Sequence, residues 1–285
     1  MKDDMLKELI RNEVTPDLVE KVLELLIPSV RLRTIAPDEA AQQIGASRIG
    51  GLPDLPSGTQ WPVVGKHALY FIAQINLVDV CPFDFGNRLP KSGLLSFFYG
   101  WDATKNCVLY IKDDQGDLSP YDPPPQLPNS ISPSWFSRLF LGKRPERVFR
   151  SCRISFSSEL TPPDGMSFAL DALSSDLVYS DEFYDKYYAL LGEEEIDPHH
   201  QLLGNPASIQ GAYMEAECAG IPLGKGPLTA EQLSQILQWK LLAQFDSDDL
   251  PGMMWGDLGR LYYYIHESDL SIGEFSRVFV NSQCY

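Results

Sequence analysis

Apolar residues near the start of the chain are spaced as in a helix. Leu18, Val22 and Leu26 recur at intervals that place them on one helical face. The pattern then changes, and residues 29–34 alternate apolar and polar side chains, as a half-buried strand does. We therefore expect N-terminal helices within residues 4–27, followed by a chain in which strands dominate.

Two helices and one irregular segment are predicted further along. Thr229 and Gln232 have the spacing of a capping box ahead of an apolar helical face, and a second helix is expected over residues 181–191. The stretch 118–133 holds six prolines, which is typical of an extended loop or linker.

Two strand-like segments occur twice in similar form. The pairs are 70–76 with 240–246, and 93–99 with 259–265. The first pair shares an apolar run that ends in Ala-Gln, then an apolar residue, then Asn or Asp, and the second pair follows it after loops of similar size. This pattern predicts an internal duplication with halves at 29–150 and 165–285. The expected fold class is α+β, with two related antiparallel sheet units packed together and an N-terminal helical segment.

Charge and cysteine usage narrow the function classes. The chain of 285 residues carries 39 acidic and 23 basic side chains, a formal net charge of −16 at pH 7, so nucleic acids and anionic membrane surfaces are repelled. No apolar stretch is long enough to span a membrane, and the first residues do not resemble an export signal. Five cysteines, an odd number without a C-x-x-C pair, fit reduced thiols. We expect a cytoplasmic protein.

A set of short motifs resembles a known family. They are Gly50-Gly51-Leu52-Pro53, Trp61-Pro62, 71–76 and 93–98 in the first half, and 200–206 with Gln210, 242–248, 255–259 and 283–285 in the second. In this order they resemble the YwqG-like family of uncharacterised bacterial proteins, over roughly residues 29–285. The resemblance implies one YwqG-like domain over residues 1–285, a mixed α+β fold and no agreed activity. Residues 113–150 match the family least well, so a specialised role is expected there.

Two strand glutamines are candidate binding residues. Gln74 and Gln244 occupy equivalent positions in apolar strands, where an unpaired buried amide costs about 1–3 kcal/mol. They can tie loops of the duplicated unit together, or they can orient a ligand in a cleft between the halves. Asp246, Asp257 and Trp255 complete the lining of that candidate cleft.

Metal and catalytic motifs are not formed in this sequence. The acidic residues around Asp248 fail the calcium-loop pattern because Leu250 and Pro251 interrupt it, and adjacent His199 and His200 point to opposite sides of an extended chain. No serine-nucleophile elbow or phosphate-binding loop is complete. We therefore expect no metal and no cofactor, and the missing motifs favour a non-enzymatic protein.

One basic and aromatic segment stands out in this acidic chain. Its candidate partner-surface residues are Trp135, Arg144, Arg147 and Arg150. Arginine and aromatic side chains anchor protein interfaces, although these arginines can equally pair with the protein's own carboxylates. The leading hypothesis is a non-enzymatic module that binds a protein partner. The alternative is an enzyme or small-ligand protein that uses the cleft between the duplicated halves.

Overall fold

A computed structural model describes the fold at residues 2–14, 16, 18–36, 43–100, 106–113, 116–125, 127, 148–164, 167–173, 198–211, 213–224 and 226–285. The strands are β1 (Ile27–Ile35), β2 (Arg48–Ile49), β3 (Asp54–Pro56), β4 (Val63–Val64), β5 (His67–Ala68), β6 (Tyr70–Asn76), β7 (Leu94–Tyr99), β8 (Asn106–Ile111), β9 (Leu118–Pro120), β10 (Cys152–Thr161), β11 (His200–Leu203), β12 (Trp239–Asp246), β13 (Arg260–His266) and β14 (Phe279–Gln283). The helices are α1 (Lys2–Glu13), α2 (Val19–Glu24), α3 (Leu77–Val80), α5 (Phe168–Asp171), α8 (Met214–Cys218), α9 (Ala230–Ile236) and α10 (Glu267–Ile272).

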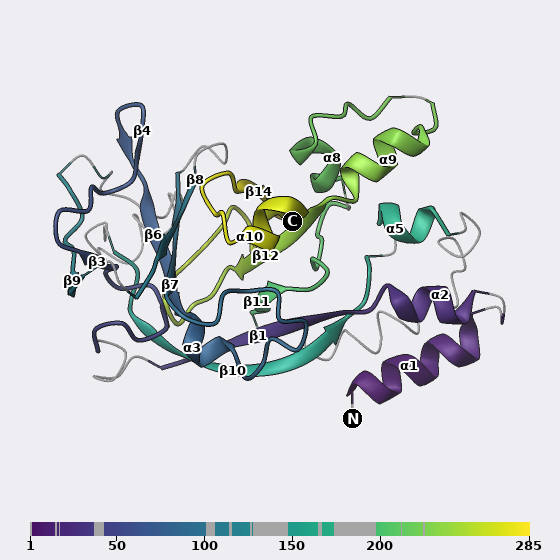
Figure 1. Ribbon diagram of the computed structural model, residues 1–285, viewed down its shortest axis with the longest axis horizontal. Helices are drawn as coiled ribbons and strands as arrows, with labels where there is room; N and C mark the ends of the chain where they lie inside the picture. The colour runs from purple at the N-terminus through teal and green to yellow at the C-terminus, as the bar shows by residue number, and fades with distance from the viewer. Residues whose placement is uncertain are drawn as a thin grey trace.

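One ten-stranded antiparallel sheet dominates the structure. Its strand order is β14-β13-β12-β11-β1-β10-β2-β6-β7-β8, and β3-β9 and β4-β5 form two small sheets. The long strand β1 pairs with β10 along its whole length, and the two strands lie along one side of the molecule (Figure 1). An α+β fold with antiparallel strands is thus confirmed. The two predicted sheet units are joined into one sheet because β1 and β10 pair between them.

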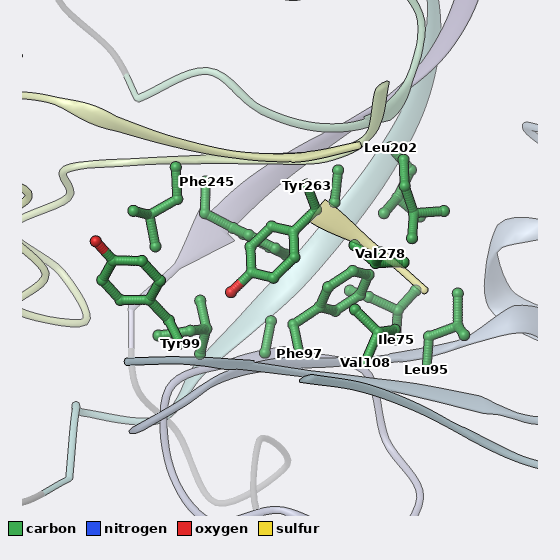
Figure 2. Packing of buried hydrophobic residues seen from close by; sticks show 14 of the residues in the cluster. Ile75, Leu95, Phe97, Tyr99, Val108, Leu202, Phe245, Tyr263 and Val278 are labelled. Atoms are coloured by element: carbon green, nitrogen blue, oxygen red, sulfur yellow. The ribbon is translucent and has the colours of Figure 1, made fainter. Parts of the chain in front are cut away.

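The hydrophobic core lies between the two arms of this sheet, β6–β8 and β12–β14. The ring of Phe97 on β7 lies 5.2 Å from the rings of both Phe245 and Tyr263, centroid to centroid. Figure 2 shows these side chains meeting from opposite arms. The Tyr263 hydroxyl donates a hydrogen bond of 3.3 Å to the backbone oxygen of Phe98. Edge-to-face ring pairs of this kind add to the burial of apolar surface and hold the arms together.

A second, smaller core holds the N-terminal helices against the end of the sheet. Its buried members include Leu6 and Ile10 from α1, Val22 from α2 and Leu170 from α5, with Leu160 of β10 packed against them. Helices therefore lie in the segment where the apolar spacing predicts them, and the strand predicted at 29–34 lies within β1.

Other sequence-based expectations have mixed outcomes. The capping box at Thr229 and Gln232 is confirmed at the start of α9. The helix expected over 181–191 lies outside the described residues. Among the residues that are described, no helix is both long enough and apolar enough to cross a membrane.

Two local features recur in the two arms. β2 is followed by Gly50 and Gly51, with φ values of 74° and 77°, and β11 ends in Leu203 and Gly204, with φ values of 60° and 80°. A side chain at Gly50 would place its Cβ 2.2 Å from the backbone oxygen of Arg150, so only glycine fits there. β6 and β12 also share a register shift just before their Ala-Gln motif. These turns and shifts position the two glutamines.

Candidate functional site

The Gln74 amide is fully buried and makes three hydrogen bonds to protein groups. Its Oε1 accepts from the backbone N–H of Asp54 at 2.8 Å. Its Nε2 donates to the backbone oxygen of Ala46 and to the Asp54 carboxylate, each at 2.8 Å. Asp54 in turn pairs with Arg48 at 2.8 Å. Gln74 therefore fastens the chain on both sides of β2.

Gln244 has the same arrangement in the other arm. Its Oε1 accepts from the backbone N–H of Ala207 at 3.0 Å, and its Nε2 donates to the backbone oxygen of His199 at 3.1 Å and to Asp246 at 2.9 Å. Arg260 pairs with Asp246 at 3.0 Å. Each glutamine therefore joins the segments before and after the neighbouring strand, β2 for Gln74 and β11 for Gln244. This agrees with the interpretation that the glutamines tie loops together.

The five residues of the predicted cleft are not brought together. Ile75 and Phe245 face the core, so their neighbours Gln74 and Gln244 point to the outer face of opposite arms. Gln244 contacts Asp246 directly. Asp257 lies exposed in a loop, and Trp255 is buried against the rings of Tyr99 and Phe149, at 5.6 and 5.7 Å.

A different cleft, of about 440 Å³, lies between β1 and the loop that follows β12. Its lining residues are Arg31, Arg33, Thr34, Pro198, Ser247, Asp248, Asp249, Leu250, Met254 and Leu258. The basic side chains come from β1, whereas the acidic and most of the apolar ones come from residues 247–258, here named the cleft loop.

Asp248 is the hydrogen-bonding centre of this cleft. Its carboxylate accepts from the Thr34 hydroxyl at 2.7 Å, from the Leu250 backbone N–H at 2.8 Å and from His200 Nε2 at 3.1 Å. Burial raises the pKa of Asp248, but these hydrogen bonds outweigh burial and hold the pKa below its ordinary value of 3.8. Asp248 is thus a stable anion and a weak proton acceptor.

His200 is fully buried behind Asp248 and uses both ring nitrogens. Its Nδ1 accepts a hydrogen bond of 3.0 Å from the backbone N–H of Asp246. A neutral imidazole carries its proton on the other nitrogen, so Nε2–H donates to Asp248. No lone pair of this ring is left to take a proton from a substrate.

Arg31 supplies a buried positive charge beside the cleft. Its side chain is 1% exposed, and Nη2 donates to the backbone oxygen of Pro198 at 2.9 Å. Arg33, two residues along the same strand, lines the same cleft and is exposed. We predicted no role for β1 from the sequence. The pattern that could have indicated one is the pair of arginines flanking Leu32 in a predicted strand.

Most of the predicted partner surface falls outside the described residues, namely Trp135, Arg144 and Arg147. Arg150 is described and exposed. Its backbone N–H donates to the oxygen of Pro251 at 2.9 Å, and its guanidinium donates to the backbone oxygen of Asp249. Arg150 therefore packs on the cleft loop. Within the described part of the chain, no group of three or more His, Cys, Asp or Glu is placed to hold a metal ion.

One carboxyl group outside the cleft has an unusual environment. Glu215 on α8 accepts from the Tyr264 hydroxyl at 3.2 Å, while its Oε2 is buried with no hydrogen-bond partner among the described residues. Burial raises the pKa of Glu215 from 4.5 to about 7, against the opposing effect of the Tyr264 hydrogen bond. At neutral pH this buried, partly ionised carboxyl group therefore lowers the free energy of unfolding.

We expect Glu215→Gln to stabilise the protein at pH 8. Below pH 4.5 the carboxyl is protonated in both folded and unfolded chains; between pH 4.5 and about 7 only the unfolded chain ionises, so folding loses stability as pH rises. The difference between the folded pKa of about 7 and the ordinary pKa of 4.5 corresponds to roughly 3 kcal/mol of stability. Urea unfolding from pH 4.5 to 8 should show this loss in the wild type and not in Glu215→Gln. The exposed Glu231→Gln is the control, and a wild-type-like pH profile for Glu215→Gln would contradict the account.

A family model described as Domain of unknown function (DUF1963) matches residues 47–284. The match includes both arms of the sheet and the cleft loop, and β1 with its two arginines precedes it. No curated protein matches the chain. The kinship predicted from the sequence is supported at the level of a family without an assigned function.

Proposed function

The chain belongs to the DUF1963 family of domains of unknown function, so its role must be inferred from its own side chains, and we propose that it binds a small molecule without catalysing a reaction. The binding site is the cleft between β1 and the cleft loop. This differs from the predicted cleft between the halves, where the hydrophobic core fills the space.

The observation that carries the proposal is the composition of this cleft. Ligand pockets typically measure about 300–1,000 Å³ and combine apolar lining with a few placed polar groups. This cleft measures about 440 Å³ and combines a buried arginine with the apolar side chains of Leu250, Met254 and Leu258. Leu250 and Leu258 are 40% and 60% exposed, so a ligand that covers them gains from the removal of apolar surface from water.

The same geometry favours binding over catalysis. A general base needs a free lone pair and a pKa near the working pH. His200 has both ring nitrogens in hydrogen bonds, and the pKa of Asp248 is held low by three donors. Asp248 therefore lines the cleft as a fixed anion held by His200, and recognition is left to the arginines and apolar side chains.

Filling the cleft should abolish binding. Leu250→Trp places a large side chain at the cleft wall while keeping the backbone N–H that bonds to Asp248. We expect wild-type protein, exposed to a metabolite extract and examined by native mass spectrometry, to retain a small molecule at a ratio of one to one, and Leu250→Trp to lose it at least tenfold.

The matched control is Leu223→Trp. Leu223 is 44% exposed, close to the 40% of Leu250, and does not line the cleft. This variant should bind as the wild type does. Equal retention by Leu250→Trp, with an unchanged unfolding temperature, would refute the proposed site.

Protein binding is a second candidate, and Arg150 is the observation that favours it. This exposed arginine joins the predicted partner segment to the cleft loop, so a protein bound there would contact the rim of the cleft. Arginine is enriched among interface anchors. Reversing the charges of Arg144 and Arg147 should release a stoichiometric partner captured by the tagged protein, and a partner that stays bound would exclude this surface.

We also infer that the two arms arose by duplication. The support is the shared hydrogen bonding of Gln74 and Gln244, the paired left-handed residues after β2 and at the end of β11, and the shared register shift. All five cysteines are free thiols, which fits the cytoplasmic location that we propose.

A further inference from the structure

The two arginines of β1 give the cleft a cationic wall. Arg31 and Arg33 are two residues apart in a strand, so their side chains leave it on the same face. A guanidinium keeps its charge at any physiological pH and presents a planar set of five N–H donors, which matches a carboxylate in bidentate geometry. The low exposure of Arg31 strengthens its electrostatic effect on a ligand.

The acidic lining residues limit how much negative charge a ligand can carry. Asp248 already receives three hydrogen bonds, yet its low pKa keeps it charged. Asp249 follows it in the cleft loop and also lines the cleft. Two carboxylates on one wall repel a second anionic group, so a polyanion is disfavoured and a single anionic group on the β1 side is favoured.

The remaining wall is apolar. Leu250, Met254 and Leu258 all belong to the cleft loop and face the cleft together with Pro198. A hydrocarbon body that covers them removes apolar surface on both partners from water. The three parts of the lining thus require one anionic group at one end of the ligand and an apolar body at the other.

On the proposal that the cleft binds a small molecule, we infer that its ligand is an apolar monocarboxylate. The carboxylate lies against Arg31 and Arg33, and the hydrocarbon part lies against Leu250, Met254 and Leu258. The same chemistry occurs in a free carboxylic acid and at the C-terminus of an apolar peptide, and the experiment separates these sources.

The test is a titration of the full chain with matched probes, monitored by calorimetry. Hexanoate, hexan-1-ol and adipate have the same chain length and carry one, no and two carboxylates. We expect hexanoate to bind at least tenfold more tightly than either of the others. Acetyl-Leu-Leu, titrated as the free acid and as the C-terminal amide, tests a peptide ligand. If the acid binds more tightly than hexanoate and the amide does not bind, the inference is supported and the carboxylate is that of a peptide C-terminus.

Variants test the assignment of the arginines. Arg33→Gln, at an exposed position, should weaken hexanoate binding at least fivefold and leave hexan-1-ol binding unchanged. Arg31→Gln should act more strongly, and Arg31→Lys, which keeps the charge without the fork, should restore part of the loss. Arg153→Gln is the control, because Arg153 is an exposed arginine on β10 that does not line the cleft.

Three results would overturn the inference. They are equal binding of hexanoate and hexan-1-ol, binding of adipate as tight as that of hexanoate, and failure of all probes to bind. If hexanoate and hexan-1-ol bind equally and Leu250→Trp binds neither, the ligand is not a monocarboxylate, but the proposed small-molecule site stands. A different result would show that the site itself is wrong: equal retention of the metabolite by Leu250→Trp and by the wild type.

Discussion

Gln244→Ala will lower the free energy of unfolding by about 3–4 kcal/mol, because it leaves several buried polar groups without partners. The amide joins the backbone N–H of Ala207, the backbone oxygen of His199 and the Asp246 carboxylate. Each orphaned buried group costs about 1–3 kcal/mol, and the empty space adds to that loss. Urea unfolding with an unchanged m-value measures the effect.

Gln74→Ala should be destabilising to a similar extent, since Gln74 makes the same set of contacts in the other arm. Gln235→Ala is the control, because Gln235 is exposed on α9 and should change stability by less than about 0.5 kcal/mol. A loss below about 1 kcal/mol in both buried variants would show that water replaces the amides easily, and the loop-tying role would then be wrong.

His200→Ala will destabilise the protein by about 3–5 kcal/mol near pH 7, because it leaves a buried carboxylate without one of its donors, leaves a backbone N–H without its acceptor, and opens a cavity. The change removes the donor to Asp248 and the acceptor for the Asp246 backbone N–H, both at a fully buried position. Because the pKa of folded Asp248 is below 3.8, its ionisation stabilises the fold above that pH, and this contribution is lost as pH falls through the folded pKa. The effect of the mutation should therefore be smaller at pH 3 than at pH 7.

Two variants sharpen this prediction. His200→Gln can still donate to Asp248 and should recover part of the loss, and the exposed His67→Ala should have almost no effect. Urea unfolding at both pH values is the measurement. A loss for His200→Ala that is the same at pH 3 and pH 7 would mean that packing alone, and not the Asp248 contact, accounts for the role of His200.

The sequence predicts most of what local chemistry determines. The capping box at Thr229, the alternating strand at 29–34 and the need of both glutamines for partners all follow from residue type and spacing. The identity of the backbone partners does not, because the backbone groups that meet Gln74 and Gln244 lie 20 to 45 residues away along the chain.

The cleft beside β1 could not be predicted because β1 pairs with distant strands. β10 and β11 flank β1 in the sheet, and neither strand is near β1 in the sequence. Alternation alone places Arg31 on an open, polar face. The structure covers that face with Pro198 and the cleft loop, which turns an apparently exposed arginine into a buried one.

The residues of the predicted cleft lie apart for a related reason. Strand periodicity places Gln74 and Gln244 next to Ile75 and Phe245, and the fold buries the latter pair at the contact between the arms. Residues on alternate positions must then point outward. The equivalence of the two glutamines was visible in the sequence, but the face that they occupy depends on how the arms fold together.

The most direct test of small-molecule binding at the cleft is methyl NMR of protein labelled at methionine, titrated with hexanoate and then with a neutral fragment set. Met254 lines the cleft, whereas Met214 is a buried residue of α8 and Met5 is exposed on α1. We expect a saturable shift of the Met254 methyl signal, with Met214 and Met5 unchanged, and loss of that shift in Leu250→Trp. A Met254 signal that stays in place while every compound is titrated, or that moves only together with Met5 and Met214, would contradict a ligand site in this cleft.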